Sequence, residues 1–458
     1  MNCSRDEPRA QMFIILLLVF GTVLLLSSCA LYNKQYQNPP EDNPSFELYA
    51  VQADDFGSLW TVSAAQAVLD RVEQLAANQN LAVVVFIHGW HHNAKVTDLN
   101  FQQFRNLLER INGQLNQPSF TKLRESISRS PTTRVLGVYI GWRGRALPGV
   151  LDYLNMWWRK DAAERVGEGD VREFIIHLQR TYLRVNSLSN IAARGVGEIR
   201  PQMGLLTIGH SFGAQVLIKA VVEGLEGDLA ERAGKQSDTL SFPYSPPSRL
   251  EERPIDTYGD LNILVNPAVE AYQFARISAL DQAVDFPRCQ LPQIMVISSD
   301  KDFPRRAFFP IARGLTLPFR PMFRRDGQQA ELWSTALGML ASQNTHTVES
   351  GGSPPAPTFT QEDYESDEGR IRIRDWDFTS PTTFRAVTLA PKSSGAGRPN
   401  SPVIVATEPG RLIPNHVDIF SPDLWSFIVD YVSFLEGKRL LWRLQWLNGD
   451  PKDRYHCQ

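Results

Sequence analysis

The sequence feature that most constrains the fold is a Gly-x-Ser-x-Gly pentapeptide at residues 209–213. A mostly apolar run, Met203–Ile208, leads into it, and a run with apolar residues at helical spacing follows it. This context predicts a strand, a sharp turn and a helix, with Ser211 at the apex of the turn. Gly209 and Gly213 remove the side chains that would collide with a strained turn of this kind. We therefore expect a projecting, nucleophilic serine, and the alternative is an ordinary glycine-rich turn with a solvent-facing serine.

Five further runs predict the strands of a sheet into which this turn fits. They are Leu81–Ile87, Arg134–Trp142, Leu261–Val265, Gln293–Ile297 and Ser401–Thr407. Continuous apolar runs such as the first are typical of parallel strands that are covered on both faces. Segments with helical periodicity alternate with these strands, so we expect an α/β fold with a mostly parallel, doubly wound sheet. In such a sheet the active site lies at the carboxyl ends of the strands.

A histidine–glycine pair follows the first of these strands. Gly89 lets the backbone turn, so that the amide of Trp90 can point toward a substrate oxygen. The amide of Phe212, directly after the serine, would be the second donor of an oxyanion hole. The neighbouring His91 and His92 are interpreted as surface or packing residues.

Two carboxylates and one histidine follow later strands at the same edge of the predicted sheet. Asp300 and Asp302 come directly after the strand at 293–297, and His416 lies between the last strand and the last helix. A histidine in this place fits a general base, and a carboxylate beside it fits the group that orients the base. The alternative is a structural histidine with solvated carboxylates. The residues themselves leave both Asp300 and Asp302 open as the acid.

These motifs resemble those of the α/β-hydrolase superfamily over most of Leu81–Gly437. Their order along the chain, serine, then acid, then histidine, is the order found in that superfamily. More narrowly, the chain resembles putative bacterial esterases and lipases, in which an aromatic–proline pair follows the acid a few residues on. Phe309-Pro310 follows Asp302 in this way, which favours Asp302 over Asp300.

The resemblance implies an α/β-hydrolase fold and hydrolysis of a carboxylic ester through an acyl-enzyme. Ser211 would attack the ester, His416 would carry the proton, and Asp302 would orient the imidazole. The amides of Trp90 and Phe212 would stabilise the oxyanion. We expect no metal or organic cofactor, and a small acyl ester or a lipid as the substrate.

Two other functions stay open. The first is a related thioesterase, transacylase or amidase that acts on components of the cell envelope. The second is a binding lipoprotein that uses the fold without catalysis. An aromatic patch at Tyr153, Trp157 and Trp158 is a candidate lid or acyl-binding wall, although we expect it to be part of the core.

The N-terminal residues have the pattern of a bacterial lipoprotein signal. An apolar run, Met12–Leu26, is short for a bilayer span and is followed by a sequence that resembles a lipobox ending in Cys29. This predicts a signal peptide at residues 1–28, lipidation of Cys29 and an extended tether over 29–45. Ala30 after the cysteine favours the outer membrane, so we expect a chain anchored in the cell envelope on the periplasmic side. The alternative is an uncleaved signal anchor.

Composition adds few constraints. A chain of 458 residues that is 43% hydrophobic can build a large core, and a net charge of -3 gives no reason to expect a nucleic-acid partner. Outside the predicted signal and lipidation site only Cys289 and Cys457 remain, and an oxidising compartment would permit them to pair.

The domain boundaries follow from composition shifts. We expect one hydrolase domain over 46–437 and a C-terminal tail over 438–458. Polar, proline-containing stretches predict an inserted surface loop over about 227–260 and a partly disordered excursion over about 342–400. His346, at the start of the second insertion, is expected to be a surface residue.

Overall fold

The computed structural model describes most of the chain after the predicted signal. The described residues are 33–125, 130–146, 152, 155–194, 201–241, 254–287, 290–308, 327–350, 364–367, 370–373, 382–384, 387–392 and 398–448. The predicted signal peptide, the predicted lipidation site and the cysteine pair lie outside them, as do Phe309-Pro310 and Tyr153. Within the described residues, no helix combines the length and the apolar character needed to cross a bilayer.

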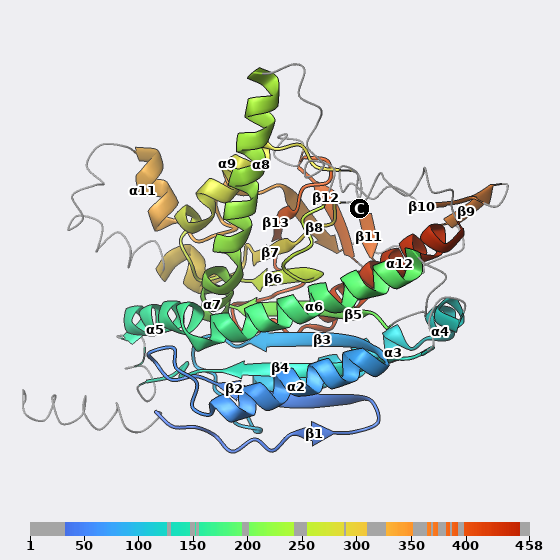
Figure 1. The fold of residues 1–458 in the computed structure, drawn as a ribbon. Coiled ribbons are helices and arrows are strands. Elements are labelled where there is room, and N and C mark those ends of the chain that lie inside the picture. Colours follow the sequence, from blue (N-terminus) through green and yellow to red (C-terminus); the bar gives the residue numbers. More distant parts are fainter. Residues whose placement is uncertain are drawn as a thin grey trace, which may run out of the picture.

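Eleven strands form one mixed sheet with a parallel centre (Figure 1). In sheet order they are β1 (Glu41–Asp42), β2 (Phe46–Gln52), β4 (Thr133–Gly141), β3 (Asn80–Ile87), β5 (Met203–His210), β6 (Leu261–Val265), β7 (Ile294–Ser299), β13 (Val403–Glu408), β8 (His346–Ser350), β12 (Val387–Pro391) and β11 (Thr382–Phe384). Every neighbouring pair from β2 to β8 is parallel, and β1, β12 and β11 extend the sheet in antiparallel fashion. A separate hairpin contains β9 (Tyr364–Asp367) and β10 (Arg370–Ile373). The α/β fold with a mostly parallel sheet is therefore confirmed.

Helices cover both faces of this sheet. They are α2 (Val62–Asn78), α3 (Leu99–Leu115), α4 (Pro118–Glu125), α5 (Met156–Glu168), α6 (Asp170–Arg194), α7 (Phe212–Leu217), α8 (Glu223–Ser241), α9 (Ala275–Ala283), α11 (Gly327–Ser334) and α12 (Pro422–Asn448). One face packs against α2, α5, α6 and α7, and the other packs against α3 and α12.

Strand β3 shows why the central strands are apolar throughout. Val83, Val85 and Ile87 point into the core on one face, whereas Val84 and Phe86 point into the core on the other. A strand has a side-chain period of two, so only a strand with helices on both faces needs apolar residues at every position. Burial of one such side chain contributes roughly 1.5–3 kcal/mol, which makes the centre of the sheet the main source of stability.

The structure corrects the predicted loop over 227–260. Its first half is helical, because α8 continues to Ser241. Leu225 and Leu229 are buried against the core, and the alanines, glutamates and lysine that follow favour a helix. The prolines that suggested a loop begin only at Pro243.

The structure also corrects the predicted excursion over 342–400. Strands β8, β12 and β11 continue the main sheet, with Val348 and Leu389 in its core. His346 is buried rather than exposed, and its Nδ1 lies 2.7 Å from the hydroxyl of Thr345. These strands are short, and β8 pairs with partners that are far away in the sequence, so composition gave them little signal.

The predicted tail boundary at 437/438 falls inside α12, which is continuous to Asn448. Leu440 packs against Phe120 of α4. Nearby, the buried guanidinium of Arg124 donates to the Glu436 carboxylate at 3.0 Å. Packing of this helix against the domain explains why no break occurs at the predicted boundary.

The described part of the predicted tether, residues 33–45, differs from a free tether. The amide of Tyr36 donates to the Gln52 side chain at 2.8 Å, and that side chain donates back to the Tyr36 carbonyl at 2.7 Å. Glu41, in β1, accepts from Arg105 at 2.8 Å. Residues from 33 onward are therefore held against the domain.

Candidate active site

Ser211 stands at a sharp turn between β5 and α7, as the sequence predicts. Its backbone is strained, with φ 54° and ψ −116°, a conformation that residues other than glycine rarely adopt. The surrounding backbone maintains this conformation. The Ser211 amide donates to the Val265 carbonyl at 3.1 Å, and the Ser211 carbonyl accepts from the amide of Ala214 at 3.1 Å.

Three glycines make the turn possible because other backbone lies too close for a side chain. A Cβ at Gly213 would come within 2.1 Å of the Ile87 carbonyl oxygen, and one at Gly209 within 2.7 Å of the Gly213 carbonyl oxygen. A Cβ at Gly89 would lie 2.8 Å from the Cβ of Ser211. The loop after β3 and the turn after β5 are therefore packed directly against each other.

We expect Gly213→Ala to distort the turn. The added methyl group would overlap backbone that cannot move freely, which should destabilise the protein by about 1–3 kcal/mol. Gly227→Ala is a matched control, because no atom lies within 4 Å of a Cβ there and the residue is inside helix α8. The control should be neutral or should stabilise the protein by up to ~1 kcal/mol. Urea unfolding checks both, and equal effects would show that the close approach at Gly213 is unimportant.

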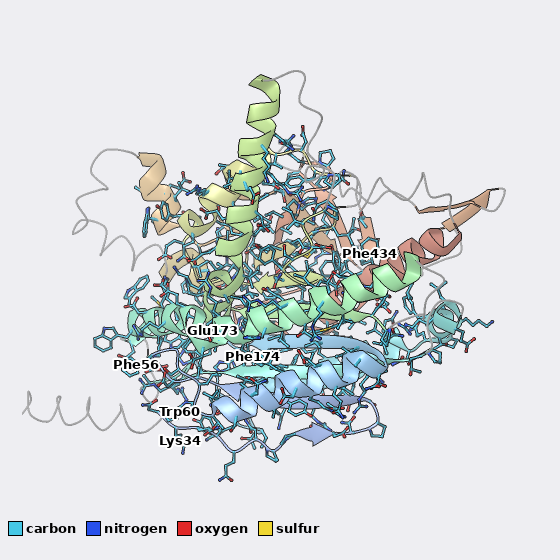
Figure 2. The ribbon with its side chains drawn as sticks, in the orientation of Figure 1. Lys34, Phe56, Trp60, Glu173, Phe174 and Phe434 are labelled. Atoms are coloured by element: carbon cyan, nitrogen blue, oxygen red, sulfur yellow. The ribbon has the colours of Figure 1, made fainter. Side chains whose placement is uncertain are left out.

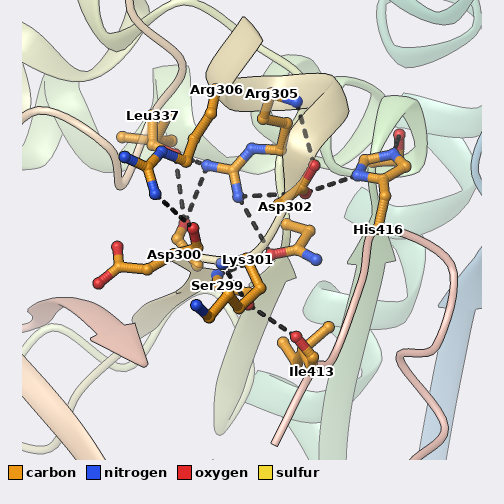
Figure 3. Close-up of polar contacts among 12 residues, drawn as sticks. Ser299, Asp300, Lys301, Asp302, Arg305, Arg306, Leu337, Ile413 and His416 are labelled. Carbon is orange, nitrogen blue, oxygen red and sulfur yellow. Dashed lines mark hydrogen bonds and ion pairs between the residues drawn. The ribbon is translucent and has the colours of Figure 1, made fainter. Parts of the chain in front are cut away.

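Three side chains that are far apart in the sequence form a continuous hydrogen-bonded chain, of which Figure 3 shows the contact between Asp302 and His416. The hydroxyl of Ser211 lies 2.8 Å from Nε2 of His416, and Nδ1 of His416 lies 2.6 Å from Oδ2 of Asp302. A carboxylate can only accept a hydrogen bond, so Nδ1 of His416 carries the proton and donates to Asp302. Nε2 then carries no proton and accepts from the serine hydroxyl. Asp300, in contrast, is exposed. The structure thus brings Asp302, and not Asp300, to the histidine.

The Asp302 carboxylate is buried and kept charged. Burial favours the neutral acid, but the charge and hydrogen bond of His416, followed by the charge of Arg305, hold the pKa of Asp302 below its usual value. A guanidinium nitrogen of Arg305 lies 3.7 Å from Oδ2, and the Arg305 amide donates to Oδ1 at 3.0 Å. Asp302 is therefore a permanent acceptor near neutral pH.

This lowered pKa predicts a pH-dependent contribution to stability. The unfolded chain binds the Asp302 proton more readily than the folded chain, so the contribution is complete above the unfolded pKa of about 3.9 and is lost as the pH falls through the folded value. Asp302→Asn should therefore cost stability at neutral pH, and the cost should shrink in acid. Urea unfolding of both proteins over a pH series measures the difference, and a cost that does not vary with pH would contradict the prediction.

Arg305 is a residue of the site that sequence reasoning missed. It is fully buried and donates to the Asn266 side chain at 3.1 Å, to the Ser298 hydroxyl at 3.0 Å and to the Leu337 carbonyl (Figure 3). Arginine in a polar loop is usually solvated, and nothing in the sequence indicated burial. This arginine joins the acid loop to the loops after β6 and α11.

The loop that carries His416 is fixed from its first residues. The carboxylate of Glu408, at the end of β13, accepts hydrogen bonds from the backbone amides of residues 410–413 at 2.6–3.2 Å. The Ser299 hydroxyl donates to the Ile413 carbonyl at 2.7 Å. The histidine is thereby positioned by main-chain contacts rather than by its ring alone.

His210, the residue before the serine, provides a further anchor. Its Nε2 donates to the main-chain carbonyl of His416 at 2.9 Å. Burial holds the pKa of His210 well below its usual value, so the ring is neutral. The Gly-x-Ser-x-Gly motif leaves this position variable, whereas the structure shows His210 linking the serine turn to the histidine loop.

The predicted oxyanion residues lie beside the serine. Phe212 is the first residue of α7, and amides in the first turn of a helix have no acceptor within that helix. Gly89 abuts Ser211, and the ring of Trp90, the next residue, lies 6.1 Å from the ring of Phe212. The two predicted donors thus belong to segments that meet at the nucleophile.

The nearby histidines hold loops together. His88 is fully buried, and its Nε2 accepts from the Trp142 amide at 3.0 Å; burial lowers its pKa to about 4. Nδ1 of His91 lies 3.0 Å from the buried carboxylate of Asp152, and Nδ1 of His92 lies 3.0 Å from that of Asp98. These contacts agree with the packing role predicted for His91 and His92.

The predicted aromatic patch does not form a simple core. Trp158 is 60% exposed, whereas the charged residues that follow it are buried. Arg159 donates to Asp55 at 2.8 Å, and the amine of Lys160 lies 3.3 Å from the Glu270 carboxylate. The start of α5 thus presents an indole to solvent.

In the part of the chain that the structure describes, no three His, Cys, Asp or Glu side chains converge to hold a metal ion. Comparisons of the chain with protein-family models, with curated proteins and with solved structures found no match.

Proposed function

We propose that this protein is a serine hydrolase with an α/β-hydrolase fold, anchored in the cell envelope, that cleaves carboxylic esters through an acyl-enzyme. The observation that carries the proposal is the hydrogen-bonded chain from Ser211 through His416 to Asp302, with distances of 2.8 and 2.6 Å. A serine hydroxyl is a weak nucleophile until a base accepts its proton, and this chain supplies that base.

In the proposed mechanism Ser211 attacks the ester carbonyl while His416 accepts the serine proton at Nε2. The resulting imidazolium is stabilised by the adjacent Asp302 carboxylate. His416 then donates the proton to the departing alcohol, which leaves an ester between the acyl group and the serine. Water attacks this acyl-enzyme with His416 again as the base, and the carboxylic acid leaves.

The oxyanion formed in each step would be stabilised by the amides of Trp90 and Phe212. Removal of one such donor typically costs ~100- to 1000-fold in rate. The strained turn at Ser211 supports this assignment, because it holds the nucleophile and the Phe212 amide in one rigid unit.

A substrate panel tests the proposal. Purified full-length protein would be incubated with esters of different acyl-chain length, and with matching thioesters and amides. We expect turnover of the esters. Turnover confined to thioesters or amides would instead indicate a related acyl-transfer enzyme, and no turnover of any compound would favour a binding lipoprotein.

A further inference from the structure

In the part of the chain that the structure describes, the exposed large hydrophobic side chains share one position in the fold, after the carboxyl ends of parallel strands. Among the described residues nine such side chains are between 39% and 77% exposed: Phe56, Trp60, Val62, Val96, Leu99, Trp158, Tyr272, Phe303 and Val417. Each of them follows the carboxyl end of a parallel strand, namely β2, β3, β4, β6, β7 or β13. On a typical soluble protein exposed hydrophobic residues are scattered singly over the surface.

The carboxyl edge of the sheet is also where the candidate active site lies. Phe303 directly follows Asp302, and Val417 directly follows His416. Ser211 itself, at the end of β5, is only 2% exposed. Phe303 and Val417 thus lie directly beside Asp302 and His416, and the other exposed hydrophobic residues follow neighbouring strands of the same sheet.

The described chain begins at the same edge. Asn33 and Lys34 line a small depression together with Trp60, Trp142 and Arg143, which follow β2 and β4. The side chain of Gln35 donates to the hydroxyl of Thr61 at 2.9 Å. Figure 2 shows Lys34 on the same side of the molecule as Phe56 and Trp60.

Little chain is left to separate this edge from a membrane. The predicted lipidation site, Cys29, is four residues before Asn33, and four residues span at most about 14 Å even when fully extended. Residues 33–45, which the sequence predicts as a spacer, are instead held on the domain. An uncleaved anchor ending at Leu26 would allow only about 25 Å.

We propose that the carboxyl edge of the sheet is seated on the bilayer in which the chain is anchored, and that the substrate is an ester held in that bilayer. Membrane-bound proteins commonly place apolar and aromatic side chains at the surface that contacts the bilayer. Lys34 and Lys95, which both lie within 6 Å of the Tyr36 ring, flank this surface with positive charge suited to lipid phosphates. The statement about the substrate rests on the proposed catalysis, whereas the seating rests only on the proposed anchoring of the chain.

A spin-label experiment tests the seating without using activity. Full-length protein with Cys289→Ser and Cys457→Ser would receive one new cysteine, be labelled with a nitroxide and be reconstituted in vesicles of phosphatidylethanolamine and phosphatidylglycerol. Phe56→Cys and Leu99→Cys probe the carboxyl edge. Lys122→Cys and Asn78→Cys are matched controls, because both residues are exposed at the opposite edge. The parent without a new cysteine should take up no label.

We expect the ratio of oxygen to nickel-chelate collisions to be several-fold higher at Phe56 and Leu99 than at the two controls, because oxygen concentrates in lipid and the chelate stays in water. Equal access of the chelate to all four positions would overturn the proposal. Shielding of Phe56 and Leu99 from both reagents would also overturn it, since a protein partner or a second copy would then cover the edge.

A second measurement tests the substrate class. The double variant Phe56→Glu, Leu99→Glu should lower hydrolysis of a vesicle-held diacyl ester by about tenfold or more, because charged groups resist burial in lipid. Lys122→Glu should leave this rate near that of the wild type. Unchanged hydrolysis by the double variant would overturn the substrate statement. If no ester is cleaved by any form while the nitroxides are membrane-embedded, the proposed function fails and the seating stands.

Discussion

Replacing Ser211 with alanine is expected to abolish ester hydrolysis while leaving the protein folded. The substitution removes only the hydroxyl group, whose oxygen lies 2.8 Å from Nε2 of His416. Without it no acyl-enzyme can form, and losses for such nucleophiles reach ~10⁶-fold. Alanine keeps the Cβ of the serine and adds no atom that could collide with neighbouring residues, so the urea unfolding curve should stay close to that of the wild type.

The measurement is the initial rate on the best ester of the substrate panel, with circular dichroism as the check on folding. Ser119→Ala, an exposed serine in helix α4 away from the site, is the matched control and should retain full activity. A rate near that of the wild type in the Ser211 variant would show that another group performs the chemistry.

The second large effect is expected for Asp302→Asn. The amide would still fill the space but could not accept a charge-assisted hydrogen bond from Nδ1, so His416 would be held in the wrong tautomer. A loss of ~10⁴-fold in turnover is the expected size for this change in a serine triad. Asp300→Asn is the matched control, because that carboxylate is exposed and two residues away, and its rate should change only a few-fold.

Both variants would be assayed on the same ester, with full pH–rate profiles. The reverse ranking, a severe loss at Asp300 and a mild one at Asp302, would mean that the acid loop rearranges when substrate binds. Equal mild losses would mean that the buried carboxylate serves packing and not the orientation of His416.

The central sheet could be predicted from the sequence because its strands are buried on both faces. A run such as Leu81–Ile87 has no polar position, and this property alone marks a covered parallel strand. The observed β3, Asn80–Ile87, differs from the prediction by one residue at its start. Strands covered on both faces can be recognised from their own residues, without knowledge of the strands with which they pair.

The edge of the sheet could not be predicted in this way. Strands β8, β12 and β11 are short and have one covered face, so their signal is weak. Strand β8 pairs with β12 about 40 residues later and with β13 about 60 residues later, so its pairing is not local, whereas β11 and β12 are neighbours in the sequence. Helix α8 was missed for a different reason. Its polar, glycine-containing sequence resembles a loop until its buried leucines are seen against the core.

The candidate site could be predicted where a residue type is tied to a place in the fold. Ser211, Asp302 and His416 each follow a strand that the sequence marks clearly, and the structure brings all three together. The residues that hold them could not be predicted. Arg305 donates to the backbone and side chains of other loops, and Glu408 accepts from the amides of the loop that follows it; only the folded chain reveals such partners.

The most direct test of the account is covalent labelling by a fluorophosphonate, followed by peptide mapping. This reagent reacts with serines that an adjacent base activates, and it needs no knowledge of the natural substrate. We expect one adduct, on Ser211, that disappears in Ser211→Ala and forms much more slowly in Asp302→Asn. Intact, folded protein that takes up no label, or that takes it up on a different serine, would contradict it.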